Sequence, residues 1–514
     1  MKILTLLRSS GISPLLPLDE AQGVAKELQE ISGTPVYPQS IVVKDGLLYF
    51  LSRKQDEKLL GILSVPQQRP TDFQGEEMAV SVEEKKLSLR SSPLTPGNAL
   101  ALRRVLKFLQ PRLVGLRTSA GLGDRLGLAT PGHVRAAQGK GLAVFFAQQS
   151  IREMSRTGRT PEQVLDDAVW GLFQEGWREG FGADADHLKT PEDVDACIAA
   201  GFTLFTVDPG EYVDDAADTD PSPVLTEKID SLPWGDLETN WEDLQHDYVE
   251  KQLKAGQFAF FFDEENLLRA AVKYGRAVAH TVRMYRHIAK GIGKDAFELE
   301  VSVDETETPT TPLEHLFVAC ELRRLDVEWV SLAPRFVGRF EKGVDYIGDL
   351  RAFEDDFTRH AAIAREFGPY KLSIHSGSDK FSIYPIAARA SEGLVHLKTA
   401  GTSYLEALRA VALLEPELFR QIAAFARERY PQDRTSYHVS AELSHVPDPH
   451  SLDDEALKEM LDEFHSREVL HVTYGSILDE FGKQLLEVLR KDEETYYQIL
   501  EQHIGRHLAP FSGL

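Results

Sequence analysis

The segment FELEVSVDETETPTT, residues 297–311, places acids where a buried strand would normally be apolar. Its alternation gives one face with Leu299, Val301 and Val303, and another with Glu298, Glu300, Ser302 and Asp304. Charges are costly to bury without a partner. We therefore predict that Glu300 points into the mouth of a barrel and holds a divalent cation. The alternative is an edge strand with one solvated face.

Two histidines at the ends of other predicted strands could complete such a metal site. His187 is the next-to-last residue of DADHL, and His375 is the last residue of KLSIH. Imidazole and carboxylate donors together suit zinc, manganese, nickel or cobalt, and three protein ligands leave positions open for substrate oxygens. We predict the ligands His187, Glu300 and His375. A histidine at a strand end can also be a hydrogen-bonded core residue. The third ligand stays open between His187 and four others: Asp184, Asp186, His438 and His471.

Further polar residues follow the first and eighth predicted strands. SAGLGDRLGLATPGH, residues 119–133, brings Asp124 and Arg125 together in a glycine-rich turn before a helix, where free N–H groups suit an anion. The alternative is a surface ion pair. Lys398 ends the eighth strand and, pointing inward, would face an anionic group or pair with an acid.

The sequence gives little support for a nucleophilic, phosphate-binding or dinucleotide-binding site. The sequence has no Gly-x-Ser-x-Gly, P-loop or Gly-x-Gly-x-x-Gly motif, and neither Cys197 nor Cys320 lies in an electropositive turn. Metal-ion chemistry on a polar small molecule is the class that remains.

The composition limits the classes of binding partner and the cellular compartment that we expect. The 514 residues carry a formal net charge of -24, which argues against nucleic acid or an anionic membrane surface but leaves room for a small anionic substrate. The two cysteines form no CxxC motif, and no apolar run approaches the roughly 18 residues of a membrane span. We expect a cytoplasmic protein. A homo-oligomer is compatible with the sequence.

The elements that must position these residues alternate between strand and helix from about residue 98. The predicted strands are Leu113–Ser119, Leu142–Gln148, Gly180–Leu188, Phe202–Val207, Phe297–Val303, Val327–Ala333, Tyr370–His375 and Leu394–Lys398. The predicted helices are Pro131–Ala137, Pro161–Glu175, Pro191–Ala199, Glu264–Ile288, Pro312–Arg324, Leu350–Glu366 and Ile383–Ala390. Eight strands with helices between them predict a (β/α)8 TIM-type barrel over residues 98–430, whose active site lies at the carboxyl ends of the strands. A doubly wound open sheet is the competitor.

Three other regions accompany the predicted barrel. Residues 1–97 are β-rich and contain a hairpin signal at Asp45-Gly46. An acidic insertion near 208–247 indicates a solvated surface excursion or a lid. Residues 431–514 form a mostly helical C-terminal extension that we expect to pack near the barrel mouth.

Seven strings of the sequence, taken in order, resemble the tagaturonate epimerase family over residues 113–480. They are SAGLGDRLGLATPGH, FELEVSVDETETPTTPLEH, WVSLAPRFVGRFEKGVDY, KLSIHSGSDKFSIYP, HLKTAGTSY, YHVSA and HVTYGSIL. The resemblance implies a metal-dependent barrel that interconverts D-tagaturonate and D-fructuronate.

These two keto acids differ at a hydroxyl carbon β to the ketone, so enolisation cannot invert it. Retro-aldol cleavage, rotation of the aldehyde and re-addition can, with a divalent metal stabilising the enediolate. The resemblance makes Asp124 and Asp304 candidates for the acid/base pair. Arg125, Lys380 and Lys398 become candidates for holding the substrate carboxylate, and His133 and Ser376 for further substrate contacts.

Two alternatives stay open. A metal-dependent sugar isomerase could use the same ligands on another keto- or aldo-sugar. A non-catalytic carbohydrate-binding barrel would bind no metal and turn over no substrate.

Overall fold

The structure, a computed structural model, describes residues 2–513. At its centre, eight parallel strands close into a barrel in chain order, which confirms the predicted (β/α)8 fold. The barrel strands are β6 (Ser119–Gly121), β7 (Ala143–Ser150), β8 (Gly182–Leu188), β9 (Leu204–Val207), β12 (Glu298–Val303), β13 (Ser331–Pro334), β14 (Lys371–Ile374) and β15 (Val395–Lys398).

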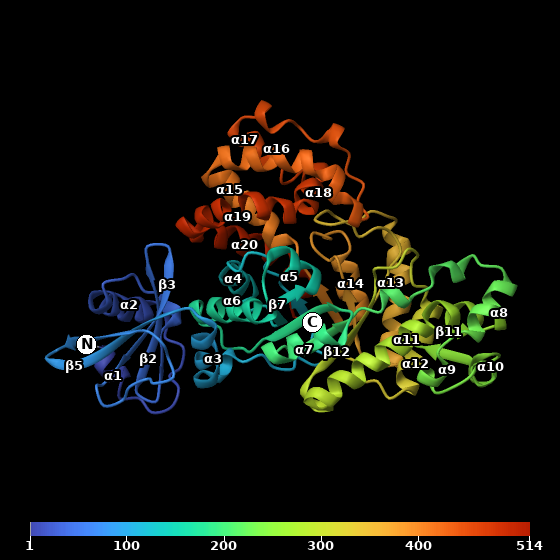
Figure 1. Ribbon diagram of the computed structural model, residues 1–514, viewed down its shortest axis with the longest axis horizontal. Coiled ribbons are helices and arrows are strands. Elements are labelled where there is room, and N and C mark those ends of the chain that lie inside the picture. Colours follow the sequence, from blue (N-terminus) through green and yellow to red (C-terminus); the bar gives the residue numbers. More distant parts are fainter. Residues whose placement is uncertain (1, 514) are drawn as a thin grey trace.

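Helices follow each strand and cover the barrel (Figure 1). They are α4 (Thr130–Ala137), α5 (Ile151–Thr157), α6 (Pro161–Gln174), α7 (Pro191–Ala200), α11 (Glu264–Ile292), α12 (Pro312–Arg324), α13 (Leu350–Glu366), α14 (Tyr384–Ser391) and α15 (Thr402–Leu414). Three of them begin with a threonine cap and a proline at the first helical position: α6, α7 and α12. In each, the threonine hydroxyl accepts the N–H three residues later, and that residue's side chain accepts the threonine N–H.

Strand β12 lies inside the barrel wall, between β9 and β13. All six of its residues are buried, including Glu298, Glu300 and Ser302. The edge-strand interpretation is therefore wrong, because both neighbours are hydrogen-bonded and neither face is open to water.

The first barrel strand begins later than the sequence predicted. Residues 113–118 form a loop, and β6 covers only 119–121. The Val114 and Gly115 N–H groups donate to the Glu298 carboxylate instead of to a neighbouring strand. A carboxylate contributed from far along the chain thus satisfies this loop, and nothing local in the sequence signals it.

The N-terminal region contains a five-stranded antiparallel sheet in the order β1-β2-β3-β5-β4. Its strands are β1 (Val42–Lys44), β2 (Leu47–Lys54), β3 (Glu57–Ser64), β4 (Glu76–Val82) and β5 (Lys85–Pro93). The predicted Asp45-Gly46 hairpin joins β1 to β2, with φ of 50° and 77° at these two residues. Three helices were not predicted: α1 (Lys2–Leu6), α2 (Leu18–Ser32) and α3 (Pro96–Val105).

The acidic insertion folds onto helix α11 at the end of the molecule opposite the N-terminal sheet (Figure 1). It contains α8 (Ser222–Asp230), α9 (Trp234–Leu237) and α10 (Trp241–Tyr248), and the hairpin of β10 (Gln252–Ala255) and β11 (Phe258–Phe261) follows it. Its Lys228 pairs with Asp214 at 2.7 Å and Asp220 at 2.6 Å. Ordered helices therefore occur where the sequence suggested a solvated excursion or lid.

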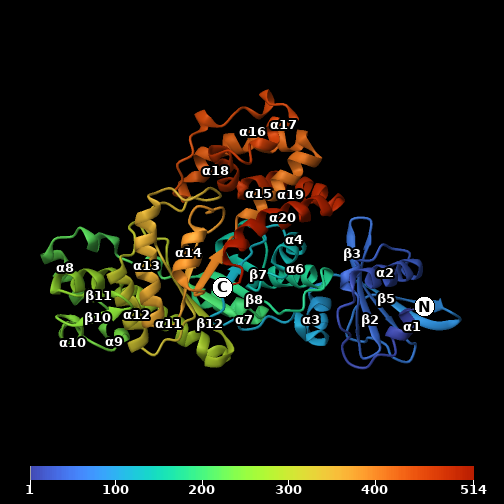
Figure 2. The same cartoon turned by 180° about the vertical axis from the view of Figure 1, so that it is seen from behind.

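The C-terminal helices stack on one side of the barrel, together with α15 (Figures 1 and 2). They are α16 (Pro416–Asp433), α17 (Asp454–Glu459), α18 (Phe464–Val472), α19 (Tyr474–Lys491) and α20 (Glu493–Leu508). Helix α20 packs closely against α4 and α15. Among the described residues, none of the helices combines the length and apolar character that a membrane crossing requires.

Candidate functional site

Two adjoining cavities lie at the carboxyl ends of the barrel strands. The inner cavity has a volume of about 60 Å³ and the outer cleft about 520 Å³. Both are lined by Arg152, Lys342, His375, Ser376 and Tyr437, so they form one continuous site. This is where a TIM barrel is expected to bind its substrate.

Lys398 lies at the centre of a buried cluster of acids. Its ammonium is 2.7 Å from Asp186, 2.7 Å from Glu300 and 2.9 Å from Asp184. It also donates to the Thr206 hydroxyl at 2.8 Å. Burial alone would lower the pKa of Lys398, but the three carboxylates raise it well above its usual value. Lys398 therefore stays protonated, and its ammonium is surrounded by the three carboxylates and the Thr206 hydroxyl.

His375 bridges two carboxylates from β12 and the residue that follows it. Its Nε2 is 2.7 Å from Glu300 Oε1, and its Nδ1 is 3.1 Å from Asp304 Oδ1. Burial lowers the pKa of His375, yet Asp304 and Glu300 together raise it to about 9. Burial would raise the pKa of Glu300, but Lys398 and His375 hold it well below the usual range. The two carboxylates and Lys398 thus tie His375 into the same buried polar network.

A bulge in β8 brings two consecutive side chains into the inner cavity. Adjacent strand residues normally point to opposite faces. Here the register shifts between Ala185 and Leu188, and His187 adopts a φ of 53°. As a result both Asp186 and His187 line the cavity.

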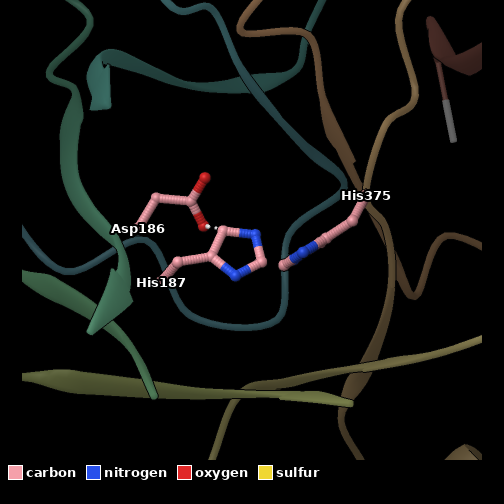
Figure 3. A group of neighbouring side chains, drawn as sticks. All are labelled: Asp186, His187 and His375. Carbon is pink, nitrogen blue, oxygen red and sulfur yellow. Dashed lines mark ion pairs between the residues drawn. The ribbon is translucent and has the colours of Figure 1, made fainter. Parts of the chain in front are cut away.

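The imidazoles of His187 and His375 lie edge to face, with their ring centroids 5.0 Å apart and an angle of 72° between the ring planes (Figure 3). His187 Nδ1 is 3.0 Å from Asp208 Oδ2, and its Nε2 is 3.9 Å from Asp186. Burial lowers the pKa of His187, but the surrounding acids, Asp186 first, raise it well above its ordinary value.

The donor set fits a divalent cation. Ligand atoms of Asp186, His187 and His375 all lie within 4.8 Å of one another, and Glu300 is in direct contact with His375. Two imidazoles and two carboxylates are the donors that zinc, manganese, nickel and cobalt share. Because metal ligands must be deprotonated, binding of a cation here would release protons from the imidazoles.

Four other candidates from the sequence also border the two cavities. Lys398 and Arg125 line the inner one, Asp304 lines the outer one, and Ser376 lines both. Arg125 donates to Glu153 Oε1 from Nε at 2.8 Å and from Nη2 at 2.6 Å. Its Nη1 is buried and finds no partner among the described residues.

Glu300 is fully buried and lines neither cavity, reaching the site only through His375 and Lys398, and three further candidates also line neither. The Asp124 carboxylate accepts the N–H groups of Leu126, Gly127 and Ala129 and so stabilises its own loop. His133 is buried in α4, with its Nε2 2.6 Å from the Ser403 hydroxyl. The Lys380 ammonium donates to three backbone carbonyls of the loops after β13 and β14. The catalytic role predicted for Asp124 and the substrate-binding roles predicted for His133 and Lys380 therefore remain predictions, because none of the three lines a cavity.

Several residues at the site were not singled out from the sequence. Arg152, Glu305, Lys342 and Tyr437 border the outer cleft. The open alternatives His438 and His471 line the outer cleft and the inner cavity, respectively. The sequence did contain a sign of Lys342's place at the site, because the loop after the sixth strand carries three cationic residues: Arg335, Arg339 and Lys342.

Comparison with known proteins identifies the family. A sequence model of the tagaturonate epimerase family, UxaE, matches residues 37–511. The chain belongs to this family. It is 44% identical over 483 residues to the tagaturonate/fructuronate epimerase of Thermotoga maritima, covering 94% of this chain and 98% of the relative. The resemblance inferred from the seven strings is therefore confirmed, and the enzyme is an isomerase.

Crystal structures of fructuronate-tagaturonate epimerase UxaE from Cohnella laeviribosi share the fold. The native form and a glycerol complex each superpose with a TM-score of 0.87 at 36% identity, covering 96% of this chain and 99% of the relative. These relationships favour an epimerase over the sugar isomerase and the non-catalytic barrel that the sequence left open.

Proposed function

We propose that the enzyme interconverts D-tagaturonate and D-fructuronate at a metal centre in the barrel mouth. The supporting observation is the convergence of His187, His375, Glu300 and Asp186 beside a cavity large enough for a sugar acid. The substrate pair is that of the similar epimerases from Thermotoga maritima and Cohnella laeviribosi.

Retro-aldol chemistry accounts for inversion at this carbon. A base removes the proton of the β-hydroxyl, the bond between the α and β carbons breaks, and its electron pair passes into the enediolate of the keto fragment. The aldehyde fragment then rotates and the enediolate carbon adds to its other face. The proton returns to the new alkoxide, so atoms and charge balance.

The residues of the site divide these tasks. A divalent cation held by His187, His375, Glu300 and Asp186 would supply Lewis-acid stabilisation of negative charge at the ketone oxygen. Asp304 lines the outer cleft and is our candidate for the base that accepts the hydroxyl proton. The second member of the pair, predicted as Asp124, has no such contact. Arg125 keeps the two N–H groups of its Nη1 for a substrate oxygen.

The setting we propose is cytoplasmic, with a small keto-hexuronate as the partner. Both cysteines are free, which agrees with a reducing compartment. The homo-oligomer considered from the sequence stays a prediction.

Glu300→Gln provides the test, because it keeps the shape of the side chain and removes its charge. We expect bound metal, measured by mass spectrometry after gel filtration, to fall below one tenth of the wild-type content. Interconversion of the two keto acids, followed by NMR, should fall at least about 1,000-fold. Glu392→Gln, on an exposed turn after α14, is the matched control. Full activity in Glu300→Gln would remove Glu300 from the ligand set.

A further inference from the structure

Lys342 extends from the loop between β13 and α13 to the junction of the inner cavity and the outer cleft, and it lines both. Its ammonium donates to the Ser376 hydroxyl at 2.6 Å. Among the described residues no carboxylate lies within ion-pair distance of it. Glu305 borders the same cleft and Lys342 helps to lower its pKa, but the two form no ion pair. The Lys342 ammonium therefore keeps donors that an anion could use.

Most other cations at the site already have an acidic partner, including Arg339, which lies 3.2 Å from Glu341. Lys398 is surrounded by three carboxylates, and Arg125 is paired with Glu153. Arg152 is paired with Glu305 at 2.7 Å. A substrate carboxylate placed against any of these would meet a positive charge that an acid already offsets. Among the described residues, neither Lys342 nor Arg335 of the outer cleft forms an ion pair, but only Lys342 of these two also lines the inner cavity.

The loop that carries Lys342 is held in place by two buried cations. The Lys380 ammonium donates to the carbonyls of Glu341 and Val344, on either side of Lys342. Arg467 Nε donates to the Gly343 carbonyl at 2.7 Å. Gly343, with a φ of 74°, also lets the loop approach His471, because a Cβ there would be 3.2 Å from the His471 ring. The backbone around Lys342 is thus fixed before any ligand binds, which reduces the entropy lost on binding.

We propose that Lys342, assisted by the Ser376 hydroxyl, binds the carboxylate of the substrate. This assignment rests on the proposed function and goes beyond it. The bond that breaks leaves the carboxylate on the aldehyde fragment, not on the enediolate. Lys342 therefore holds the fragment that must rotate, and retains it in the site until the carbon–carbon bond forms again. An epimerase needs this anchor, because loss of the aldehyde acid would leave only cleavage.

Lys342→Met tests the assignment by comparing two ligands. We expect kcat/KM for D-tagaturonate to fall about 10- to 100-fold, the range for loss of a hydrogen bond to a charged group. D-tagatose carries a hydroxymethyl group in place of the carboxylate. Its inhibition constant as a competitor should change less than about 2-fold, since Lys342 would not contact a charge there. Release of a three-carbon aldehyde acid, detected by trapping, should rise above the wild-type level.

Two further variants control the experiment. Lys483→Met removes the same charge from α19, where the side chain is 91% exposed, and should leave both constants unchanged. Lys342→Arg keeps the charge and should recover most of the affinity for D-tagaturonate. Metal content and melting temperature equal to wild type establish that Lys342→Met is folded.

Other outcomes would overturn either the Lys342 assignment or the proposed function. If Lys342→Met weakens both sugars to the same extent, or leaves the KM for D-tagaturonate unchanged, the carboxylate lies elsewhere and the assignment is overturned. A wild-type enzyme that converts neither keto acid overturns the proposed function instead. Direct titration of D-tagaturonate and D-tagatose into both proteins then decides the role of Lys342 on its own.

Discussion

Asp208 shows how one carboxylate outside the proposed ligand set can govern the metal site. It lies 3.0 Å from His187 Nδ1 and also accepts the Gly210 N–H at 2.9 Å, so it is fixed itself. A hydrogen bond from Nδ1 leaves Nε2 of His187 free to face Asp186 and His375. Such carboxylates set the tautomer and orientation of a ligating histidine.

Asp208→Asn should therefore lower metal affinity about 10- to 100-fold while keeping the residue's volume. Competition with a chromophoric chelator measures the dissociation constant. Asp195→Asn is the matched control, because Asp195 pairs with the surface residue His287 at 2.7 Å, outside both cavities. Equal affinity in Asp208→Asn and wild type would exclude this orienting role.

At the residue scale, the sequence located the strand ends but not the local backbone geometry. Glu300 and His375 could be found because polar residues at strand ends have few structural explanations. The joint presence of Asp186 and His187 depends on the bulge in β8, which alternation along the strand argues against. Lys380 was predicted to bind substrate, and only the fold reveals that three carbonyls occupy its donors.

At the scale of elements, the contact between α4 and α20 is unusually close. A Cβ added at Gly132 would lie 2.6 Å from Leu500 Cβ. His133 is buried beside this contact, and burial lowers its pKa to about 4. Between pH 6.5 and 4, the unfolded chain binds a proton at this histidine that the folded chain does not. Stability is therefore complete above pH 6.5 and is lost as pH falls toward 4.

His133→Gln should weaken this acid sensitivity, because glutamine can still hydrogen-bond Ser403 and does not titrate. We expect the melting temperature, followed by circular dichroism, to fall less between pH 7 and pH 4.5 in the variant than in wild type. His246→Gln, at an exposed position on α10, should retain the wild-type dependence. Parallel curves for His133→Gln and wild type would contradict the prediction.

The ends of the helices were predicted best, and the start of the first barrel strand was predicted worst. α12 and α13 have the predicted bounds, because threonine, proline and aspartate caps are local signals. The β6 error arose because residues 113–118 are as apolar as a strand, while their hydrogen-bond partner lies on β12. Helix α2 was missed beside strong strand signals.

At the scale of the whole molecule, the chain has no covalent cross-link. Cys197 and Cys320 are free, and burial raises the pKa of each thiol to about 12. Neither should react with Ellman's reagent within minutes in the folded enzyme, whereas both should react in guanidinium chloride. The absorbance of the released thiolate gives the count. Rapid labelling of the native protein would show that one of these cores opens readily.

The walls of the cavities come partly from the last quarter of the chain, through Tyr437, His438 and His471. During translation, all eight strands of the barrel have been synthesised once residue 398 has left the ribosome. The enclosure for the sugar acid is finished only after residue 471 has emerged. A nascent or prematurely terminated chain can thus carry every candidate ligand of the metal and still lack the chamber in which a cleaved substrate could be held and resealed.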